Sequence, residues 1–240
     1  GHLMLTSKTY EATIRLGQAT LTDDADGEVV SAAGAGLVGP VDVAGAMAAL
    51  RGTITQVPST VSAIKVDGQR AYARVRRGED VVLAGRTVTV SRFDALDFRR
   101  LEVDGVPVLD LDVVVDCSSG TYIRALARDL GSALGTGGHL TRLRRTRVGG
   151  FSLADPHLDP AALEQAPGSA VPLLGLAEVA RRSFPAVDLD DAAAADVRHG
   201  RALGFAVPGP VAAVLGGGEL LALYRPEADR SVAVAVLVGG

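Results

Sequence analysis

The richest concentration of side chains that could do chemistry is the stretch CSSGTYIRALARDLG, Cys117 to Gly131. It places a loop of small residues between a buried strand and the start of a helix, where free backbone amides favour an anion. Tyr122 and Arg124 lie at the start of that helix. The residues alone leave a second interpretation open, in which the loop is only a turn, Tyr122 packs in the core and Arg124 is a surface residue.

A second stretch, QVPSTVSAIKVDGQRAYARVRRG, runs from Gln56 to Gly78. Lys65 and four arginines accumulate in it around Tyr72. Basic residues interleaved with an aromatic residue suit a surface that follows phosphates and offers one stacking platform. A solvated helix face would have the same composition, so both interpretations stay open.

A third stretch, HLTRLRRTRVGGF, ends at Phe151 and is rich in arginine. A strand face that carries several arginines is expected of a nucleic-acid surface, and it is also compatible with simple solubility. If the stretch is a strand, its side chains divide between two faces: Arg142 and Arg144 on one, and Leu143, Arg145 and Arg147 on the other.

Charge is unevenly distributed along the chain. The net charge is −4, yet Lys65 to Phe151 holds 15 basic and 11 acidic residues, and the rest of the chain holds 9 and 17. Arginine outnumbers lysine 22 to 2, a bias that genome composition can also produce. Charge therefore permits an RNA partner without demanding one.

Several classes of protein are excluded by composition. No run of about 18 apolar residues exists, so no membrane span is expected, and Gly1 to Thr6 lacks the order of a signal peptide. The single cysteine, Cys117, excludes a disulfide framework and suits the reducing cytoplasm. The four histidines lie at no metal-ligand spacing with Cys117, so no metal is expected.

The elements that must position these residues follow from hydrophobic periodicity. Alternating apolar and polar residues predict a half-buried strand from Lys8 to Gly17, followed by an acidic turn at Thr22 to Glu28. Leucines at four-residue spacing predict a helix from Thr121 to Leu134, with Arg124 and Arg128 on a different face. The remaining elements expected in this part are a helix capped by Asp42 and stopped by Gly52, a helix over Gln69–Arg77, and strands at Arg86–Phe93, Val108–Asp116 and Leu140–Val148.

The length of 240 residues allows one large domain or two modest ones. The pattern changes after Arg182, where a short helix at Asp190–His199 precedes three apolar runs: Ala206–Leu215, Glu219–Tyr224 and Ser231–Val238. We therefore predict an N-terminal domain over residues 1–182 and a small β domain over residues 183–240.

Four stretches of the sequence resemble the TruB family of bacterial tRNA pseudouridine synthases. They are KTYEATIRLGQATLTDDADGE, which begins at Lys8, the stretch CSSGTYIRALARDLG, and the second and third stretches described above. The resemblance is close up to about Phe151 and looser beyond it. It implies a mixed α/β (α+β) catalytic domain with a central antiparallel sheet, followed by a small PUA-like RNA-binding β domain. It also implies an isomerase that acts as a cytoplasmic monomer on a uridine in the T-arm of tRNA, with no cofactor, no metal and no membrane.

The resemblance implies roles for four residues in one pocket. Tyr10, in KTY, matches the active-site tyrosine that lies against the target base. Arg124, in GTYIR, matches the arginine that pairs with the catalytic aspartate, and Tyr122 belongs to the same pocket. Leu143, in LRR, matches an apolar residue that lines it.

Lys65 and Tyr72 fall in a family motif near the bound RNA. The family's reaction detaches uracil from its ribose, rotates it and rejoins it through a ring carbon. This chemistry needs an aspartate as nucleophile or base, an aromatic ring to hold the flipped base, and an arginine to keep the carboxylate ionised.

The sequence departs from the family at the nucleophile. The family's GTLDPxxTG motif, which carries the aspartate upstream of the KTY strand, does not occur in these 240 residues. We therefore expect a family member without its N-terminal segment, inactive as it stands, in which Asp23, Asp24 and Asp26 form a solvated turn. The alternatives are a non-catalytic tRNA-binding or tRNA-folding protein and a plain scaffold.

Overall fold

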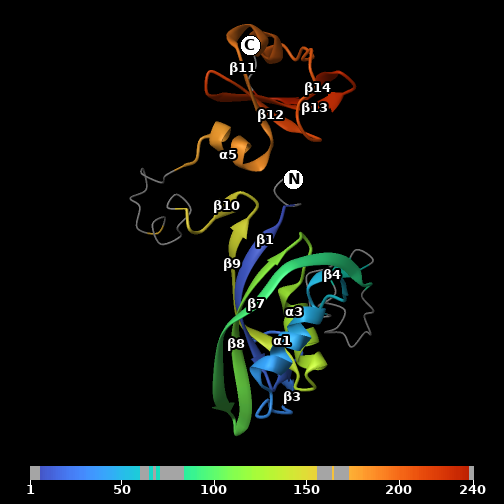
Figure 1. The fold of residues 1–240 in the computed structure, drawn as a ribbon, viewed down its shortest axis with the longest axis vertical. Coiled ribbons are helices and arrows are strands. Elements are labelled where there is room, and N and C mark those ends of the chain that lie inside the picture. Colours follow the sequence, from blue (N-terminus) through green and yellow to red (C-terminus); the bar gives the residue numbers. More distant parts are fainter. Residues whose placement is uncertain are drawn as a thin grey trace. The chain divides into compact units, whose positions relative to one another are not determined.

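The chain divides into two compact units, one ending at Val148 and the other beginning at Gly149. Figure 1 draws the computed structural model, which describes residues 6–59, 65–66, 69–70, 84–155, 164 and 173–237. Each unit has its own buried hydrophobic cluster. The mixed α+β class expected from the sequence is therefore confirmed, with a sheet and helices in both units.

An antiparallel sheet organises the N-terminal unit. The strands that this unit contributes are ordered β9-β1-β8-β7-β4, and every neighbouring pair among them is antiparallel. The expected central antiparallel sheet is present, and the strand predicted from Lys8 lies within it. The bounds of the five strands are β1, Lys8–Leu16; β4, Gly52–Gln56; β7, Arg86–Val103; β8, Val106–Cys117; and β9, Gly138–Val148.

The β7–β8 hairpin is longer than the periodicity predicts, because the prediction ends β7 at Phe93 and the strand continues to Val103. Most of the added residues are exposed and lack alternation, so no hydrophobic signal marks them. A two-residue turn, Asp104 and Gly105, joins the strands with φ values of 52° and 76°. Positive φ at both positions is the geometry that Asp-Gly favours in tight hairpins.

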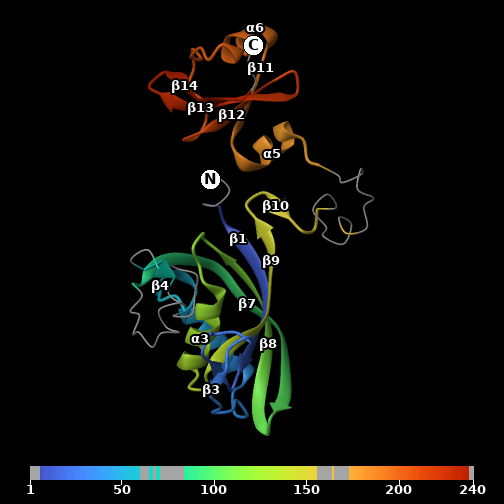
Figure 2. The ribbon, with the colours of Figure 1, turned by 180° about the vertical axis from the view of Figure 1, so that it is seen from behind.

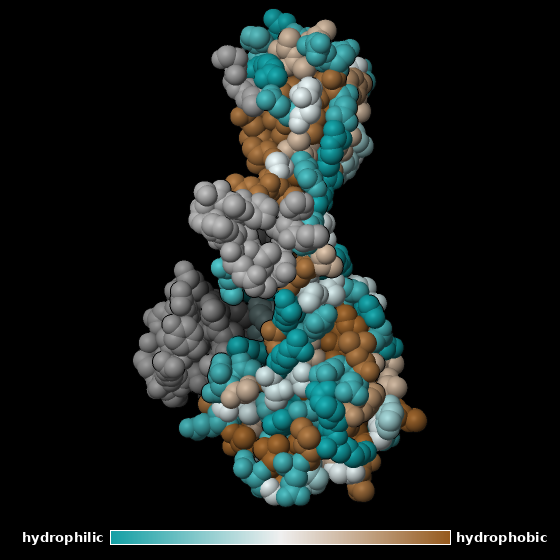
Figure 3. All heavy atoms as spheres, turned by 90° about the vertical axis from the view of Figure 1, so that its left-hand side faces the viewer, coloured by the Kyte–Doolittle hydropathy of each residue, from teal (hydrophilic) through white to brown (hydrophobic). Residues whose placement is uncertain are grey.

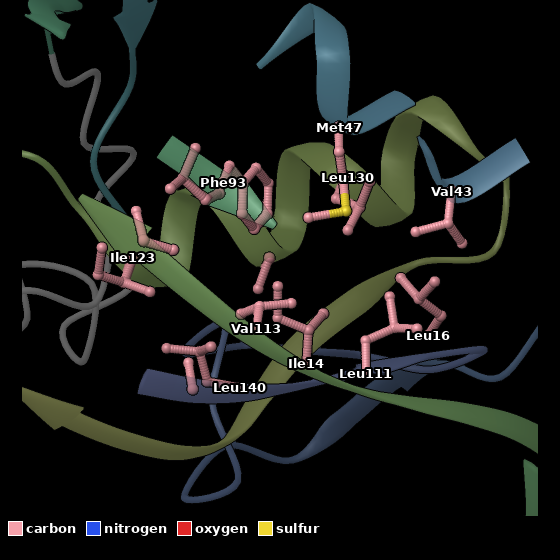
Figure 4. Close-up of a cluster of buried hydrophobic side chains, with 14 of the residues drawn as sticks. Ile14, Leu16, Val43, Met47, Phe93, Leu111, Val113, Ile123, Leu130 and Leu140 are labelled. Carbon is pink, nitrogen blue, oxygen red and sulfur yellow. The ribbon is translucent and has the colours of Figure 1, made fainter. Parts of the chain in front are cut away.

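Two helices cover one side of this sheet, α1 (Pro40–Ala49) and α3 (Ile123–Ala133). Figures 1 and 2 show both helices on the same side of the bent strands. Figure 4 shows Met47 of α1 and Leu130 of α3 facing Ile14 of β1 and Val113 of β8, all buried. The leucine spacing therefore predicts the core face of α3 correctly.

The prediction that Asp42 caps α1 is wrong. The helix begins at Pro40 with Gly39 as its N-cap, and the Asp42 carboxylate accepts a hydrogen bond from the Gly39 backbone N–H at 2.9 Å. Proline is favourable at the first helical position, where no N–H partner is needed. Asp42 therefore lies inside the first turn of the helix, where its carboxylate satisfies the backbone N–H of the N-cap residue.

Short strands complete the N-terminal unit. The strand pair β2 (Ala19–Thr20) and β3 (Val29–Ser31) brackets the acidic turn. The pair β5 (Lys65–Val66) and β6 (Gln69–Arg70) is antiparallel. The helix predicted over 69–77 is therefore wrong at its start, because Gln69 and Arg70 pair as a strand; residues 71–77 lie outside the described residues.

The C-terminal unit holds a four-stranded sheet ordered β11-β12-β13-β14, with only the β11–β12 pair parallel. The short helix predicted at Asp190–His199 is present as α6 (Asp191–Arg198). Asp190 is its N-cap, because the Asp190 carboxylate accepts a hydrogen bond from the Ala193 N–H. A small β domain is thus present. The elements of this unit are β10, Phe151–Ser152; α5, Leu176–Ser183; β11, Ala186–Leu189; α6, Asp191–Arg198; β12, Ala212–Gly216; β13, Glu219–Glu227; and β14, Arg230–Val236.

No helix within the described ranges has the length and apolar character needed to cross a membrane. Figure 3 shows hydrophilic and hydrophobic residues intermixed over the face of the N-terminal unit that it presents.

Guanidinium–carboxylate pairs stabilise the side of the sheet away from α1 and α3. Thr13 alternates with the core residues of β1 and donates to Asp112 at 2.6 Å, while Arg99 donates to both Asp112 oxygens at 2.5 and 2.9 Å. The hydrogen bonds from Arg99 and then Thr13 lower the pKa of Asp112 to about 2. Since the unfolded value is about 4, the ionised carboxylate stabilises the fold above pH 4.

We expect Asp112→Asn to lower the free energy of unfolding by about 1 kcal/mol at pH 7. The difference from the unmutated protein should shrink as the pH falls from about 4 toward 2, because the native carboxylate is protonated there. Urea unfolding at several pH values measures it. Glu102→Gln, at an exposed position of β7, is the control. A pH-independent difference would contradict the assignment.

Candidate active site

A cavity of about 250 Å³ opens in the N-terminal unit. This is below the roughly 300 Å³ at which pockets for drug-sized ligands begin, and it suits a single small ring. Four of the six site residues expected from the sequence line it together. The lining residues are Tyr10, Tyr122, Arg124 and Leu143, with Ser59, Thr121 and Ile123.

Strand register brings Tyr10 and Leu143 together. Ala12 of β1 is opposite Leu143 of β9, and Tyr10 is opposite Arg145. Tyr10 and Leu143 are therefore diagonal neighbours on one face of the sheet, close enough for an aromatic side chain to reach across. Leu143 is 46% exposed, an apolar side chain left uncovered at the cavity.

The same pairing corrects one prediction about the arginines of β9. Simple alternation predicts Arg147 on the face of Leu143 and Arg145, but Arg147 pairs with Thr9, whereas Arg145 pairs with Tyr10. Thr146 is the extra residue of a bulge, which reverses the facing of the residues that follow it. Arg147 instead donates to the Thr9 hydroxyl at 2.8 Å and forms an ion pair with Asp116.

Tyr122 is fixed by a residue that the sequence analysis missed. The fully buried Gln56 at the end of β4 accepts from the Tyr122 backbone N–H at 2.9 Å and donates to the Tyr122 carbonyl at 3.2 Å. Its amide thus pairs with the backbone as a neighbouring strand would. Nothing in the local sequence distinguishes Gln56, since its partner is 66 residues away.

Arg124 has an unexpected partner in the acidic turn. Its guanidinium, 43% exposed, forms an ion pair with the Asp24 carboxylate, which is 12% exposed. Thr22 Oγ1 and the Asp26 N–H also donate to Asp24 Oδ1. Thr20 Oγ1 donates to the Asp24 carbonyl at 2.7 Å.

The expectation of a solvated turn is therefore wrong for Asp23 and Asp24, which are both buried, and holds only for the exposed Asp26. Asp23 pairs with Arg128 of α3 at 3.2 Å. Burial raises the pKa of Asp23, and the charge of Arg128 opposes that rise. The composition of the turn predicts solvation because its partners are about 100 residues away in the sequence.

A second hollow of about 180 Å³ adjoins the first and shares Arg124 and Leu143 with it. Asp24, Asp26 and Arg142 contribute to its lining. Arg124 thus lines the same cavity as two tyrosines, and its guanidinium is partly accessible and already paired with a carboxylate. Such a site can hold a flat ring by stacking and can stabilise a second anionic group.

The two remaining site residues are not brought into this cavity by the described structure. The backbone of Lys65 pairs with Arg70 in the β5–β6 ladder. The Lys65 side chain and the whole of Tyr72 lie outside the described residues. Within the described ranges, no cluster of His, Cys, Asp and Glu has the arrangement of a metal site.

Comparison with family models gives three matches that follow one another along the chain. Residues 1–123 match the model of the TruB family pseudouridylate synthase N-terminal domain. Residues 124–166 match the tRNA pseudouridylate synthase B C-terminal domain, and residues 184–238 match the model described as tRNA pseudouridine synthase II, C terminal.

Curated relatives match nearly the whole chain. The tRNA pseudouridine synthase B of Mycobacteroides abscessus is 51% identical over 238 residues, which cover 99% of this chain and 78% of the relative. That of Cutibacterium acnes is 51% identical, with 99% and 80% covered. That of Nocardia farcinica is 52% identical, with 99% and 75% covered.

Two solved structures share the fold at low sequence identity. A Cbf5–Nop10–Gar1 complex aligns with a TM-score of 0.60 and 24% identity, over 98% of this chain and 67% of that chain. An H/ACA RNP bound to a substrate RNA containing 2'-deoxyuridine aligns with a TM-score of 0.60 and 22% identity, over 99% and 67%.

We expect Gln56→Met to lower the free energy of unfolding by about 2 kcal/mol, because it leaves the N–H and carbonyl of Tyr122 without their partners in a buried place. Urea unfolding monitored by circular dichroism measures the change. Thr53→Met, at an exposed position of the same strand, is the matched control. Equal stability of the two variants would show that the Gln56 bonds contribute nothing.

Proposed function

The chain belongs to the TruB family of tRNA pseudouridine synthases, and we propose that the cavity lined by Tyr10, Tyr122, Arg124 and Leu143 is the site where it acts. The protein is an isomerase that converts uridine in tRNA to pseudouridine. The observation that carries the site assignment is the convergence of these four side chains from β1, β9 and the start of α3 on one small cavity.

The cavity chemistry follows from the proposed roles. The target uridine leaves its stack in the T-loop and enters the cavity, at a cost of a few kcal/mol that stacking and hydrogen bonds recover. Tyr10 lies against the uracil, and Tyr122 and Leu143 form the remaining walls. The bond from uracil N1 to ribose C1′ breaks, the ring rotates within these walls, and uracil C5 forms the new bond to C1′. C5 then loses its proton and N1 gains one, so the product is an isomer of the substrate.

Arg124 is proposed to keep the reacting carboxylate ionised, since a guanidinium at hydrogen-bond distance lowers the pKa of a carboxyl. The Arg124 guanidinium has five N–H donors and is 43% exposed, so it can donate hydrogen bonds to a second carboxylate while it is paired with Asp24. The 240 residues contain no GTLDPxxTG sequence. We therefore propose that the nucleophilic aspartate is supplied by a segment other than these residues, and that Asp24 remains the structural partner of Arg124.

The proposed substrate contact is the T-arm of tRNA, bound by a monomer in the cytoplasm. Arg142, Arg144 and Arg145 are exposed along β9, the strand that carries Leu143, and they suit phosphates on either side of the flipped base. Lys65 and Tyr72 are proposed to contact the RNA as well. We assign residues 1–182 to catalysis and residues 183–240 to a PUA-like RNA-binding domain. A non-catalytic tRNA-binding protein is not favoured, because relatives matching 99% of the chain are named synthases.

We expect Arg124→Ala in the full-length gene product to lower kcat about 100-fold or more, because the reacting carboxylate loses its charge partner. The Kd for tRNA should change less than about fivefold. Multiple-turnover formation of pseudouridine, followed by mass spectrometry, measures kcat, and filter binding measures the Kd. Arg92→Ala, on the same sheet and outside the cavity lining, is the control. Near-normal turnover would remove Arg124 from the proposed role.

The 240-residue chain itself is expected to bind tRNA at low salt, with an affinity that falls steeply as salt is added, and to form no pseudouridine. The same two assays measure these properties, after circular dichroism has shown that the preparation is folded. Turnover by this chain would overturn the proposal that the nucleophile lies elsewhere. Absence of tRNA binding by a folded preparation would argue against the proposed RNA surface.

A further inference from the structure

Arg128 joins three segments behind the cavity and has no role so far. It lies four residues after Arg124, one turn further along α3. Its guanidinium pairs with Asp23 at 3.2 Å, donates to the Val57 carbonyl at 2.8 Å and donates to Asp129 at 2.9 Å. Arg128 is 29% exposed and lines neither of the two hollows described above. The hydrogen bonds of Arg128 therefore go to other residues of the protein, and its side chain does not border either hollow.

The segment reached through Asp23 carries the partner of Arg124. Asp23 directly precedes Asp24 and has a φ of 59°, in the left-handed region. Its N–H donates to the Thr20 carbonyl at 3.3 Å, and its carbonyl accepts from the Leu140 N–H at 3.0 Å. The Asp23 carboxylate is the remaining anchor of this backbone position, and Arg128, together with the Ser59 side chain, holds it.

The segment reached through Val57 carries a wall of the cavity. Val57 is two residues before Ser59, which lines the cavity, and the Ser59 hydroxyl donates to the Thr22 carbonyl at 3.3 Å. The acidic turn and the residues that follow β4 are thus hydrogen-bonded to each other, and both are hydrogen-bonded to the Arg128 guanidinium. Movement of Arg128 would remove one hydrogen bond from each segment at once.

We propose that Arg128 is a positioning residue for pseudouridine formation: through Asp23 it holds Asp24 against Arg124, and through Val57 it holds the Ser59 wall. The inference rests on the proposed function of the cavity. A planar guanidinium bonds to several acceptors in fixed directions, which a lysine ammonium cannot reproduce. Loss of Arg128 leaves the Asp23 carboxylate buried without its cation, and such a charge is costly enough to drive the turn toward solvent.

The test uses four variants in the full-length gene product: Arg128→Met, Arg128→Lys, Asp23→Asn and the double variant Arg128→Met/Asp23→Asn. We expect Arg128→Met to lower kcat about 10- to 100-fold, since displacements near 1 Å cost that much. The KM for tRNA should stay within about threefold. Arg128→Lys should recover less than half of the loss on a logarithmic scale.

The double variant supplies a readout that a general loss of stability would not give. Asparagine tolerates left-handed φ and carries no charge. Asp23→Asn should therefore raise the kcat of Arg128→Met at least threefold while lowering the kcat of the unmutated protein. Arg51→Met is the matched control, because Arg51 also bonds a carbonyl (Phe93) and a carboxylate (Asp94) and lies outside both hollows. Its kcat should be unchanged.

Three results would overturn the inference. A raised KM with unchanged kcat in Arg128→Met would mean that Arg128 binds RNA directly. A lowered Tm with unchanged kcat and KM would mean that its role is structural only. Failure of Asp23→Asn to raise the kcat of Arg128→Met would remove the proposed route through Asp23. An unmutated protein that forms no pseudouridine would instead overturn the proposed function, and the inference with it.

Discussion

The end of helix α3 and the start of strand β9 approach each other so closely at Gly131 and Gly138 that no side chain fits there, and the arrangement of the cavity depends on this contact. A Cβ atom on Gly131 would lie 2.2 Å from the Gly137 carbonyl carbon, and one on Gly138 would lie 2.4 Å from the Ala127 carbonyl oxygen. Both distances are far below van der Waals contact. The glycines let the helix rest on the first residues of β9, so that Arg124 and Leu143, from separate elements, border the same cavity.

The position of α3 determines the electrostatics of the acidic turn. Asp23 and Asp24 are adjacent in the chain, and Arg128 and Arg124 are one helical turn apart, so two neighbouring carboxylates meet two guanidinium groups on one helix face. Each carboxylate would be costly to bury alone. The pairing makes burial of the turn possible, and the parallel bridge between Asp24 and Leu140 attaches the turn to β9 beside the cavity.

Hydrophobic periodicity predicts single helices and strands, whereas most contacts in the candidate site join residues that are far apart in the sequence. Alternation in β1 and leucine spacing in α3 depend on each element's own buried face, so both elements follow from the sequence. The grouping of the four cavity residues in one pocket comes from the family resemblance, because no pattern places Tyr10 beside Leu143. The burial of Asp24, the bonds of Gln56 and the bulge at Thr146 depend on partners 66 to 137 residues away. The composition of the acidic turn therefore predicts that it is solvated, although Asp23 and Asp24 are buried and ion-paired.

The two ion pairs of α3 differ in what they leave accessible. Buried ion pairs add little to stability compared with apolar packing, and their best-supported contribution is to specify one arrangement. The Asp23–Arg128 pair is the more enclosed at the guanidinium, and its remaining donors contact Val57 and Asp129. The Asp24–Arg124 pair leaves the guanidinium open to the cavity. One helix face thus passes from a closed pair to an open one within a single turn. Under the proposed roles, Arg124 faces the substrate, and its orientation depends on the Asp23–Arg128 pair, which lies outside both hollows.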